Sequence, residues 1–443
     1  MAEEDGRRAA ATGEAVRRRA PLLAALALAA SCGAPPEGTD GRSGEVTTPV
    51  RPVLERIALD AAAASAAGAL EMTAGEDDVA LLLELALADP AHDIGISRVI
   101  APDGTVVHDS AFGPDSWEPV RFASEIVAEP IVGTGDLALS LPSTPHRPVS
   151  AGRWRVEFET EPPDAPLARA VLTLKRDVDG AVADGAAHVV DVHVHVLHPD
   201  ARYRGARFGR ALDTAWRAAF ERMLAPHALA VGAIEVTVGS RRERRRLAEL
   251  EGEEELAEAC RAIRLAGDEA GSADARESGA AAETAPVFHV GFVAEIVDAG
   301  ESIAIDEGDW TTGLAPQPGM VWDERSPGAC AFVAERPWRE RDTDGRVLDE
   351  ATVVELLAAN LLHELGHFAG LAHPSEVDGV TFDLLDDTPR CTSPDADVCG
   401  IAGGADNLMF HSGDAATLPW TLTPEQAWVL RRHPLFRPVA TTR

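Results

Sequence analysis

Residues 363–373 read His-Glu-Leu-Gly-His-Phe-Ala-Gly-Leu-Ala-His, and this stretch decides the fold of the chain around it. On a helix, His363 and His367 are one turn apart, so both imidazoles leave the same face. Gly370 lets the chain leave the helix with a positive φ, which a residue with a Cβ resists. That exit brings His373 back toward the other two histidines. Three imidazoles arranged in this way can bind one zinc ion and leave its fourth coordination position open.

Glu364 follows the first histidine and points away from the two imidazoles of the helix. A carboxylate in this place can take a proton from a water that the zinc ion activates, which makes Glu364 the expected general base. The alternative is a buried helix with three fortuitous histidines. Five fixed positions arise by chance on the order of once in several thousand chains of this length, which argues against that alternative.

Further motifs follow the histidine stretch in a defined order. An acidic segment at 383–389 precedes Cys391 and Cys399, and Asn407-Leu408-Met409-Phe410 and Leu422-Thr423-Pro424-Glu425-Gln426 come after them. Together with the histidine motif, these segments resemble the metzincin zinc endopeptidases and, among them, the pappalysin family. They are also similar to lipoprotein metalloproteases of high-GC bacteria such as myxobacteria. The resemblance covers residues 350–430 well and reaches back weakly to about residue 188.

The resemblance implies an α+β catalytic domain of metzincin layout, with a twisted mixed sheet, a zinc helix and an irregular lower lobe. It implies a zinc endopeptidase that acts on protein or peptide substrates, with Met409 as a hydrophobic floor under the metal. It also implies structural calcium near the acidic segment, with Asp383, Asp386 and Asp387 as oxygen ligands. A solvated acidic turn is the alternative for these three carboxylates.

One position departs from the pappalysin pattern. The family usually places a tyrosine two residues after the methionine, where it contacts the zinc site and the developing oxyanion. His411 occupies that position here, and the single tyrosine of the chain is Tyr203. We therefore consider His411 as a catalytic hydrogen-bond donor to the oxyanion. The alternative is a loop histidine at the surface.

The N-terminal residues resemble an export signal. Arg17-Arg18-Arg19 precede an apolar run from Pro21 to Ala30, which leads into Ser31-Cys32. A charged region, a short apolar region and small residues in this order predict a signal peptide over 1–31. The cysteine resembles that of a bacterial lipobox, so Cys32 is the expected lipidation site. Residues 32–50, rich in Gly, Pro, Ser and Thr, would then be a flexible tether.

These features predict an exported lipoprotein of the cell envelope, in the outer membrane, that contacts the membrane only through its N-terminal lipid. A secreted protein without lipid and a cytosolic protein are the alternatives. The four later cysteines allow three disulfide pairings in an exported chain. Cys391 with Cys399 is the favoured local pair, and Cys260 with Cys330 would follow by elimination.

Charge narrows the range of partners. The formal net charge of the 443 residues is −33. This disfavours nucleic acid as a partner because two polyanions repel one another. The composition suits an extracytoplasmic protein, and we expect it to act as a monomer.

Residues 51–187 predict an antiparallel β-sandwich domain that precedes the catalytic domain. Short apolar or alternating segments are separated by turn signals, and Asp103-Gly104 is a good hairpin turn. The segments are Val79–Leu87, Ile94–Ile100, Thr105–His108, Leu137–Leu141, Trp154–Glu159 and Ala170–Leu174, of which the first could equally be a short helix. No cluster of catalytic residue types occurs here. Substrate docking, envelope attachment and a prosegment are the roles that remain open.

Residues 188–443 predict the zinc metallopeptidase domain. The expected elements are strands at Val189–Leu197, Ile234–Val238 and Val287–Ile296, an edge strand at Ala329–Ala334, and helices at Arg207–Leu224 and Leu348–Phe368 with Asp349 as N-cap. An extended substrate would add to the edge strand. The charge blocks of residues 240–286 predict an inserted exposed helix followed by a disordered loop.

Two other classes of function remain beside the endopeptidase. The chain could be a catalytically silent surface binding module that keeps the zinc scaffold, which the missing tyrosine and the charged insert favour slightly. It could also be a zinc amidase that acts on envelope material. The intact set of three histidines and Glu364 argues against the silent module.

Overall fold

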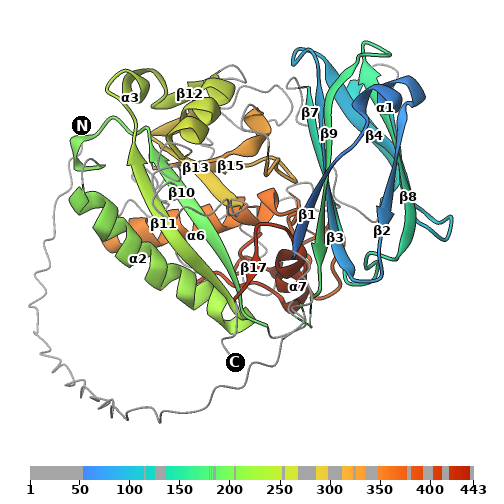
Figure 1. Ribbon diagram of the computed structural model, residues 1–443. Coiled ribbons are helices and arrows are strands. Elements are labelled where there is room, and N and C mark those ends of the chain that lie inside the picture. Colours follow the sequence, from blue (N-terminus) through green and yellow to red (C-terminus); the bar gives the residue numbers. More distant parts are fainter. Residues whose placement is uncertain are drawn as a thin grey trace, which may run out of the picture. The chain divides into compact units, whose positions relative to one another are not determined.

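The computed structural model describes residues 53–439 with gaps (Figure 1). The residues outside the description are 1–52, 114–115, 125–134, 179, 181, 183–185, 204–205, 252–254, 268–285, 298–311, 323–325, 336–347, 377–380, 393–402, 412–418 and 440–443. The expected signal peptide, the tether and Cys32 lie outside the described residues. No helix in the described part of the chain is long and apolar enough to cross a membrane.

The described residues of the N-terminal part form two antiparallel sheets and one short helix. One sheet has the strand order β1-β9-β3-β7, and the other has the order β2-β8-β4-β5-β6. Their bounds are β1 (Leu54–Ala58), β2 (Ala69–Ala74), β3 (Asp78–Leu87), β4 (Asp93–Ile100), β5 (Val106–Gly113), β6 (Ser116–Ser124), β7 (Asp136–Leu141), β8 (Gly152–Glu161) and β9 (Leu167–Arg176), with helix α1 at Ala61–Ala67. The six expected segments are all strands, and Val79–Leu87 is strand β3 rather than a helix.

The two sheets share one core of buried side chains. In β2 the apolar residues Leu70 and Met72 are buried, whereas Glu71 between them is exposed, as a strand with one covered face requires. Trp154 of β8 is buried in the same core. Strand β3 is buried along both faces: Leu81 faces this core, whereas Leu82 packs in the core of the C-terminal part.

The C-terminal part is built on a mixed sheet with the strand order β11-β10-β13-β16-β15. Its strands are β10 (His188–Val196), β11 (Leu229–Val238), β13 (Val287–Val293), β15 (Gly313–Leu314) and β16 (Ala331–Ala334), and β17 (Arg437–Pro438) pairs with β10. Strands β11, β10, β13 and β16 are mutually parallel, whereas β15 is antiparallel to β16. With the antiparallel sheets, this makes the chain a mixed α+β protein.

The edge of this sheet differs from the expectation. Residues 329–334 were expected as the edge strand, but β16 is covered by β15 on its outer side. Residues Pro327–Ala329 form a short 3-10 helix, η3, instead of strand. The two residues of β15 are too few to show a strand pattern in the sequence. The outermost described strand is therefore β15.

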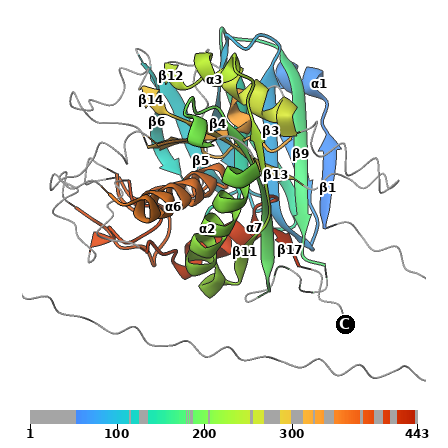
Figure 2. The ribbon, with the colours of Figure 1, turned by 90° about the vertical axis from the view of Figure 1, so that its left-hand side faces the viewer.

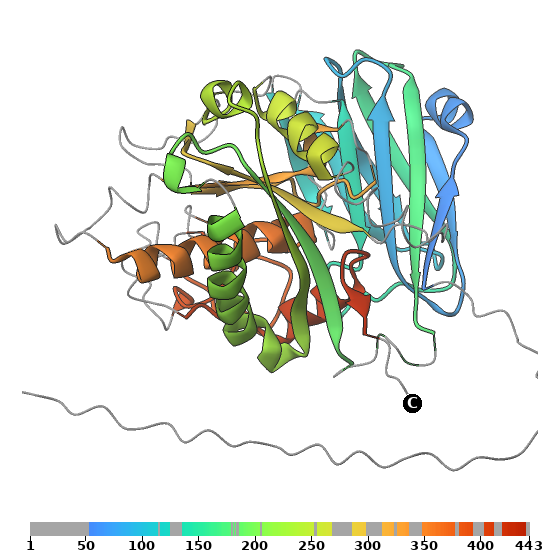
Figure 3. The same cartoon turned by 60° about the vertical axis from the view of Figure 1, so that its left-hand side comes forward.

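Helices α2 (Ala206–Leu224) and α6 (Glu350–Phe368) pack against one another on one face of the mixed sheet (Figures 2 and 3). Buried Trp216 and Phe220 of α2 lie in the same core as the leucines of α6. Phe368 of α6 makes an edge-to-face ring contact with Phe288 of β13. The remaining short elements of this part are η1 (Ala201–Tyr203), η2 (Ala225–His227) and the last helix, α7 (Pro424–Arg432).

The insert at 240–286 is more ordered than its charge blocks predict. It contains helix α3 (Glu243–Arg246), strand β12 (Glu249–Glu251) and helical residues 255–267. The expected strand Val287–Ile296 is interrupted at Ala294 and forms two strands, β13 and β14 (Glu295–Val297), which belong to different sheets. Strand β12 pairs in parallel with β14. The described part of the insert is thus a packed element, and residues 268–285 lie outside the description.

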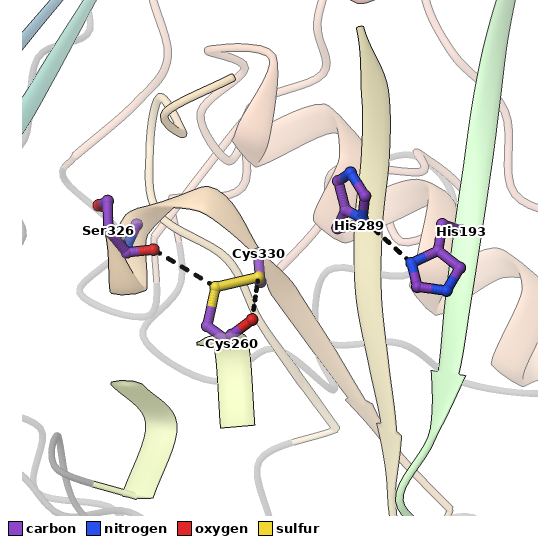
Figure 4. The surroundings of a disulfide bond; sticks show 6 residues. His193, Cys260, His289, Ser326 and Cys330 are labelled. Carbon is purple, nitrogen blue, oxygen red and sulfur yellow. Dashed lines mark hydrogen bonds between the residues drawn. A yellow bond between two sulfur atoms is a disulfide. The ribbon is translucent and has the colours of Figure 1, made fainter. Parts of the chain in front are cut away.

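A disulfide joins the insert to the sheet (Figure 4). Cys260 of the helical segment is bonded to Cys330, which directly precedes β16. Ile263 of the same segment lies against Gly291 of β13, on the face of the sheet opposite to Phe288, since side chains alternate along a strand. Apolar Ala259, Cys260 and Ile263 are fully buried. Three layers result, with the insert covering the second face of the mixed sheet.

The N-terminal sheets are joined to the C-terminal part through buried polar contacts. Lys175 of β9 is fully buried, and its ammonium donates hydrogen bonds to the carbonyls of Arg431, His433 and Phe436 at the end of α7. Glu84 of β3 accepts a hydrogen bond from the backbone N–H of Trp322 at 2.9 Å. These contacts fall within residues 51–443, which form one compact unit.

Candidate metal centre

Helix α6 carries the histidine motif and ends where the sequence predicts. Asp349 caps its first turn by accepting a hydrogen bond from the N–H of Thr352. At the other end, the N–H of Gly370 donates to the His367 carbonyl and the N–H of Leu371 donates to the Gly366 carbonyl. This pair of bonds is a Schellman motif, in which Gly370 has φ +88°. The glycine exit expected for the third histidine is confirmed.

The three histidines converge on one point. The Nε2 atom of His367 lies 3.0 Å from that of His363 and 3.0 Å from that of His373, and the remaining pair is 3.3 Å apart. Ligand nitrogens about 2.0–2.1 Å from a tetrahedral zinc ion are about 3.3 Å from one another. In the described part of the chain, these three residues are the group able to hold a metal ion.

Each imidazole is oriented by a hydrogen bond on its other nitrogen. Nδ1 of His363 lies 2.7 Å from the Leu408 carbonyl, and Nδ1 of His367 lies 2.9 Å from the Leu371 carbonyl. Nδ1 of His373 lies 2.9 Å from a carboxylate oxygen of Glu376. Because carbonyls and carboxylates only accept, each Nδ1 carries the proton and each Nε2 presents a lone pair.

Electrostatics favour the same protonation state. Burial, together with the smaller effect of the neighbouring His373, lowers the pKa of His363 to about 3. Burial also lowers the pKa of His367 well below its usual value. Both imidazoles are therefore neutral across the physiological range, as metal ligands must be. A divalent cation between three inward lone pairs satisfies them, so the donor set fits zinc.

Glu364 lies beside the ligands under the edge strand β15. Its side chain is almost fully buried, and burial raises its pKa well above the usual value for a glutamate. A Cβ placed on Gly313 of β15 would lie 2.1 Å from Oε1 of Glu364. The carboxyl thus occupies the space that a side chain at position 313 would need.

Met409 packs against helix α6 at Gly366, within the histidine motif. It is fully buried, and its Sδ lies 2.3 Å from the place of a Cβ on Gly366. Gly366, the fourth residue of the histidine motif, therefore lets the methionine approach the helix. The sequence alone does not predict a role for this glycine, because the contact joins segments about forty residues apart.

A pair of amides fixes the turn that carries Met409. The side chains of Asn407 and Gln426 exchange two hydrogen bonds of 3.0 Å, and Asn407 also accepts the N–H of Met409 at 2.9 Å. Gln426 completes a capping box with Thr423 at the start of α7. The Asn-x-Met motif and the Thr-Pro-x-Gln motif are thus joined by hydrogen bonds into one structure.

His411 lies next to the third ligand. Its ring centroid is 6.2 Å from that of His373, and its Nδ1 donates to the Ser375 carbonyl at 2.7 Å. With the proton on Nδ1, the buried Nε2 atom carries a lone pair in the neutral ring. Burial lowers the pKa of His411. A neutral His411 in this orientation can accept a hydrogen bond but cannot donate one to an oxyanion.

The three expected calcium ligands have separate partners. Asp383 accepts the hydroxyl of Thr388 at 2.7 Å. Asp387 accepts the N–H of Glu425 at 2.9 Å, and Asp386 lies 3.1 Å from His146. No group of three carboxylates is gathered among the described residues. The structure therefore does not bring Asp383, Asp386 and Asp387 together as a ligand set.

The structure describes only some of the cysteines. The pair Cys260–Cys330 is bonded as expected. Cys391 is also in a disulfide, and Cys399, its expected partner, lies outside the described residues.

A second histidine group lies on the mixed sheet. His193 and His289 are buried with their Nδ1 atoms 3.1 Å apart (Figure 4), and Thr237 joins His193 to His195. These rings form no three-ligand group in the described residues.

No protein-family model matches this chain, and no curated protein sequence matches it. One similar solved structure is metalloproteinase-II from Bacteroides fragilis, with 10% identity and a TM-score of 0.21 over 51% of this chain and 57% of that one. Another is the CspB protease of Clostridium perfringens, with 14% identity and a TM-score of 0.15 over 28% of this chain and 25% of that one. The match thus spans little more than half of the first protein and a quarter of the second. Such slight likenesses carry no argument about function.

Proposed function

We propose that this chain is a zinc-dependent endopeptidase of metzincin type, with His363, His367 and His373 as metal ligands and Glu364 as general base. The observation that carries the proposal is the convergence of three Nε2 lone pairs, each fixed by a hydrogen bond at Nδ1, beside a buried carboxyl. The pappalysin type within the metzincins rests on the sequence resemblance. The edge strand above the carboxyl favours an extended peptide as substrate.

The residues of the chain have separate tasks in this reaction. Zinc, when bound, supplies a Lewis acid that polarises the scissile carbonyl and acidifies water. Glu364 takes a proton from the attacking water at its carboxylate and returns it to the leaving amine nitrogen. Glu364 is almost fully buried beneath β15, which keeps bulk water away from the carboxyl that holds the proton between the two steps.

The oxyanion needs a donor that neutral His411 does not provide. With Nδ1–H committed to Ser375, the ring could donate from Nε2 only as an imidazolium. We propose a catalytic role for His411 only in that form. An unchanged kcat/KM in His411→Ala would remove the residue from the reaction.

Cleavage of a diverse peptide library by the purified chain tests the proposal. We expect cleavage by the zinc-loaded protein, loss of cleavage with a chelator and recovery when zinc is restored. Glu364→Gln should bind zinc with unchanged stoichiometry and cut at least about a thousand-fold more slowly, because only the proton transfer is lost. Metal analysis of both proteins is the control.

Two outcomes would point to the other classes of function. A folded, zinc-loaded chain that cuts no peptide but releases amines from envelope material would be a zinc amidase. One that binds a peptide without cutting either substrate would be the silent surface module.

We further propose that the chain is an exported envelope lipoprotein anchored through Cys32. The leader pattern supports this, as does the Cys260–Cys330 disulfide, because such bonds persist in oxidising compartments. Mass spectrometry of membrane-extracted protein should find a lipid-modified Cys32 as the first residue. A free Cys32 thiol would contradict the anchor.

A further inference from the structure

Edge strand β15 is tied to the zinc helix by one buried amide. Asn360 lies one turn before Glu364 on α6 and is only 4% exposed. Its Nδ2 donates to the Thr312 carbonyl at 2.5 Å, and its Oδ1 accepts the Thr312 hydroxyl at 3.4 Å. The same carbonyl accepts the N–H of Ala334 in β16 at 2.9 Å. The carbonyl oxygen of Thr312 therefore connects helix α6 to strand β16 at the edge of the sheet.

A buried asparagine amide in an apolar helix is unfavourable unless a hydrogen-bond contact compensates for it. Asparagine is a weak helix former, and the neighbouring α6 residues Ala358, Ala359, Leu361 and Leu362 are all buried and apolar. A buried amide without partners would destabilise the fold. The bonds to Thr312 remove that penalty, and they are the contacts that Asn360 makes toward the edge strand.

Gly313, next to Thr312, completes the arrangement. A Cβ there would lie 2.1 Å from Glu364 Oε1 and 2.8 Å from Asn360 Nδ2. The φ of Gly313 is not in the positive range, so the backbone does not require a glycine. The requirement is space, because Glu364 and Asn360 fill the volume under this residue.

We propose that Asn360 is a positioning residue that holds β15 at a fixed height over Glu364, and that Gly313 is the position where strand and base meet. This inference rests on the proposed peptidase function. A substrate strand added to β15 then lies at a defined distance from the base. Only two residue pairs join β15 to β16, so without Asn360 that distance varies.

If Asn360 acts in this way, its substitution should slow proton transfer and leave metal binding unchanged. The hydrogen bonds of Asn360 described above go to Thr312 and not to one of the three histidines. Asn360→Ala should therefore lower kcat by about 10- to 100-fold, as expected when a base is misplaced by about 1 Å, with a smaller change in KM. Gly313→Ala should lower kcat similarly, because the added methyl displaces the Glu364 carboxyl. The double variant should lose less than the product of both factors, since both act through one distance.

Three measurements test the proposal on the full chain. The first is kcat and KM for each variant. The second is zinc affinity by competition with a chelator, which should be unchanged. The third is hydrogen exchange of the Ala334 amide, which should become faster in Asn360→Ala because its acceptor, the Thr312 carbonyl, is no longer held.

A helix variant controls for general loss of stability. Val353 is buried in the core on the same helix, about two turns before Asn360. Val353→Ala should lower Tm without lowering kcat. If Asn360→Ala keeps native kcat and native Ala334 exchange while the native chain cuts peptide, the inference is overturned. If the zinc-loaded native chain cuts no peptide, the proposed function fails, and the exchange rate of the Ala334 amide still reports whether Asn360 holds Thr312 and β15 in place.

Discussion

At the scale of single residues, Gly366 shows how the site depends on a missing side chain. Gly366→Ala places a Cβ 2.3 Å from Met409 Sδ, so the turn that carries Met409 must shift away from helix α6. We expect a loss of about 1–3 kcal/mol in unfolding free energy and weaker zinc binding. Chemical denaturation with and without zinc measures both effects.

A second helical glycine provides the control for this change. A Cβ on Gly209 of α2 would lie 3.7 Å from Val236, which is ordinary contact. Gly209→Ala should be neutral or stabilise the protein by up to about 1 kcal/mol, since alanine favours helix. Equal losses in the two variants would contradict the role of the Met409 contact.

Asp383 makes stability depend on pH. Burial raises its pKa from 3.8 to about 6. Below about pH 4 the carboxyl is protonated in folded and unfolded chains alike. Between about pH 4 and 6 only the unfolded chain releases the proton, so the folded state loses up to about 3 kcal/mol of relative stability as pH rises.

Asp383→Asn isolates this contribution. The amide keeps an oxygen for Thr388 but does not ionise, so the variant should gain stability relative to the native chain from pH 4 to 7. Denaturation of both proteins at several pH values gives the difference. Added calcium should shift the Tm of neither protein. A calcium-dependent rise in the native Tm that the variant lacks would restore Asp383 as a ligand.

The histidines and Gly370 were predictable because their roles follow from spacing within one helix and its exit. Gly366 and Asn360 were not, because their partners come from other segments of the chain. Glu376 was also missed, although it lies only three residues after its partner His373. His411 was found from its position after Met409, but its hydrogen bond to Ser375 gives it the opposite capacity from the expected one.

At the scale of elements, helix α7 fixes the turn that carries Met409. Thr423→Ala removes the N-cap of α7 and should cost about 1 kcal/mol. Gln426→Leu removes the capping box and also leaves the Asn407 amide buried without its partner, so it should cost about 1–3 kcal/mol more. The difference between the two variants in denaturation experiments isolates the amide pair. Equal losses would mean that Asn407 is held by other contacts.

Elements with strong periodicity were predicted well, and those defined by tertiary contact were not. The helices at 207–224 and 348–368 agree with α2 and α6 to within two residues. Strand β15 has two residues and no pattern, so the edge was assigned to β16. In the insert, the charge blocks predicted an exposed helix and a disordered loop. The packing is determined instead by three buried residues, Ala259, Cys260 and Ile263.

At the scale of the whole molecule, the N-terminal sheets are connected to the three-histidine site through a series of contacts. Lys175, the single lysine of the sequence, donates to three carbonyls at the end of α7. Helix α7 holds the Met409 turn through Gln426, and that turn accepts the hydrogen bond of His363 at Leu408. Such an arrangement favours a supporting role for residues 51–187 over a removable prosegment.

Lys175→Met tests this connection with a side chain of similar length. The change leaves three buried carbonyls without their hydrogen-bond donor and should cost at least about 3 kcal/mol, because each buried polar group left unpaired costs about 1–3 kcal/mol. Zinc affinity should fall with it, because α7 loosens. Amine labelling provides a second readout, since buried Lys175 should react only after unfolding. Native stability and native zinc binding in Lys175→Met would contradict the connection.

Cutting the full chain between the two parts decides between support and prosegment. A site for a specific protease inserted near residue 180, between β9 and β10, allows the folded chain to be nicked. Buried contacts from Lys175 and Glu84 should keep the two fragments together, with unchanged peptidase activity. Separation of the fragments in mild denaturant should then abolish activity. A prosegment would give the opposite result: activity would rise when the N-terminal fragment leaves, and the remaining fragment would bind zinc as tightly as before.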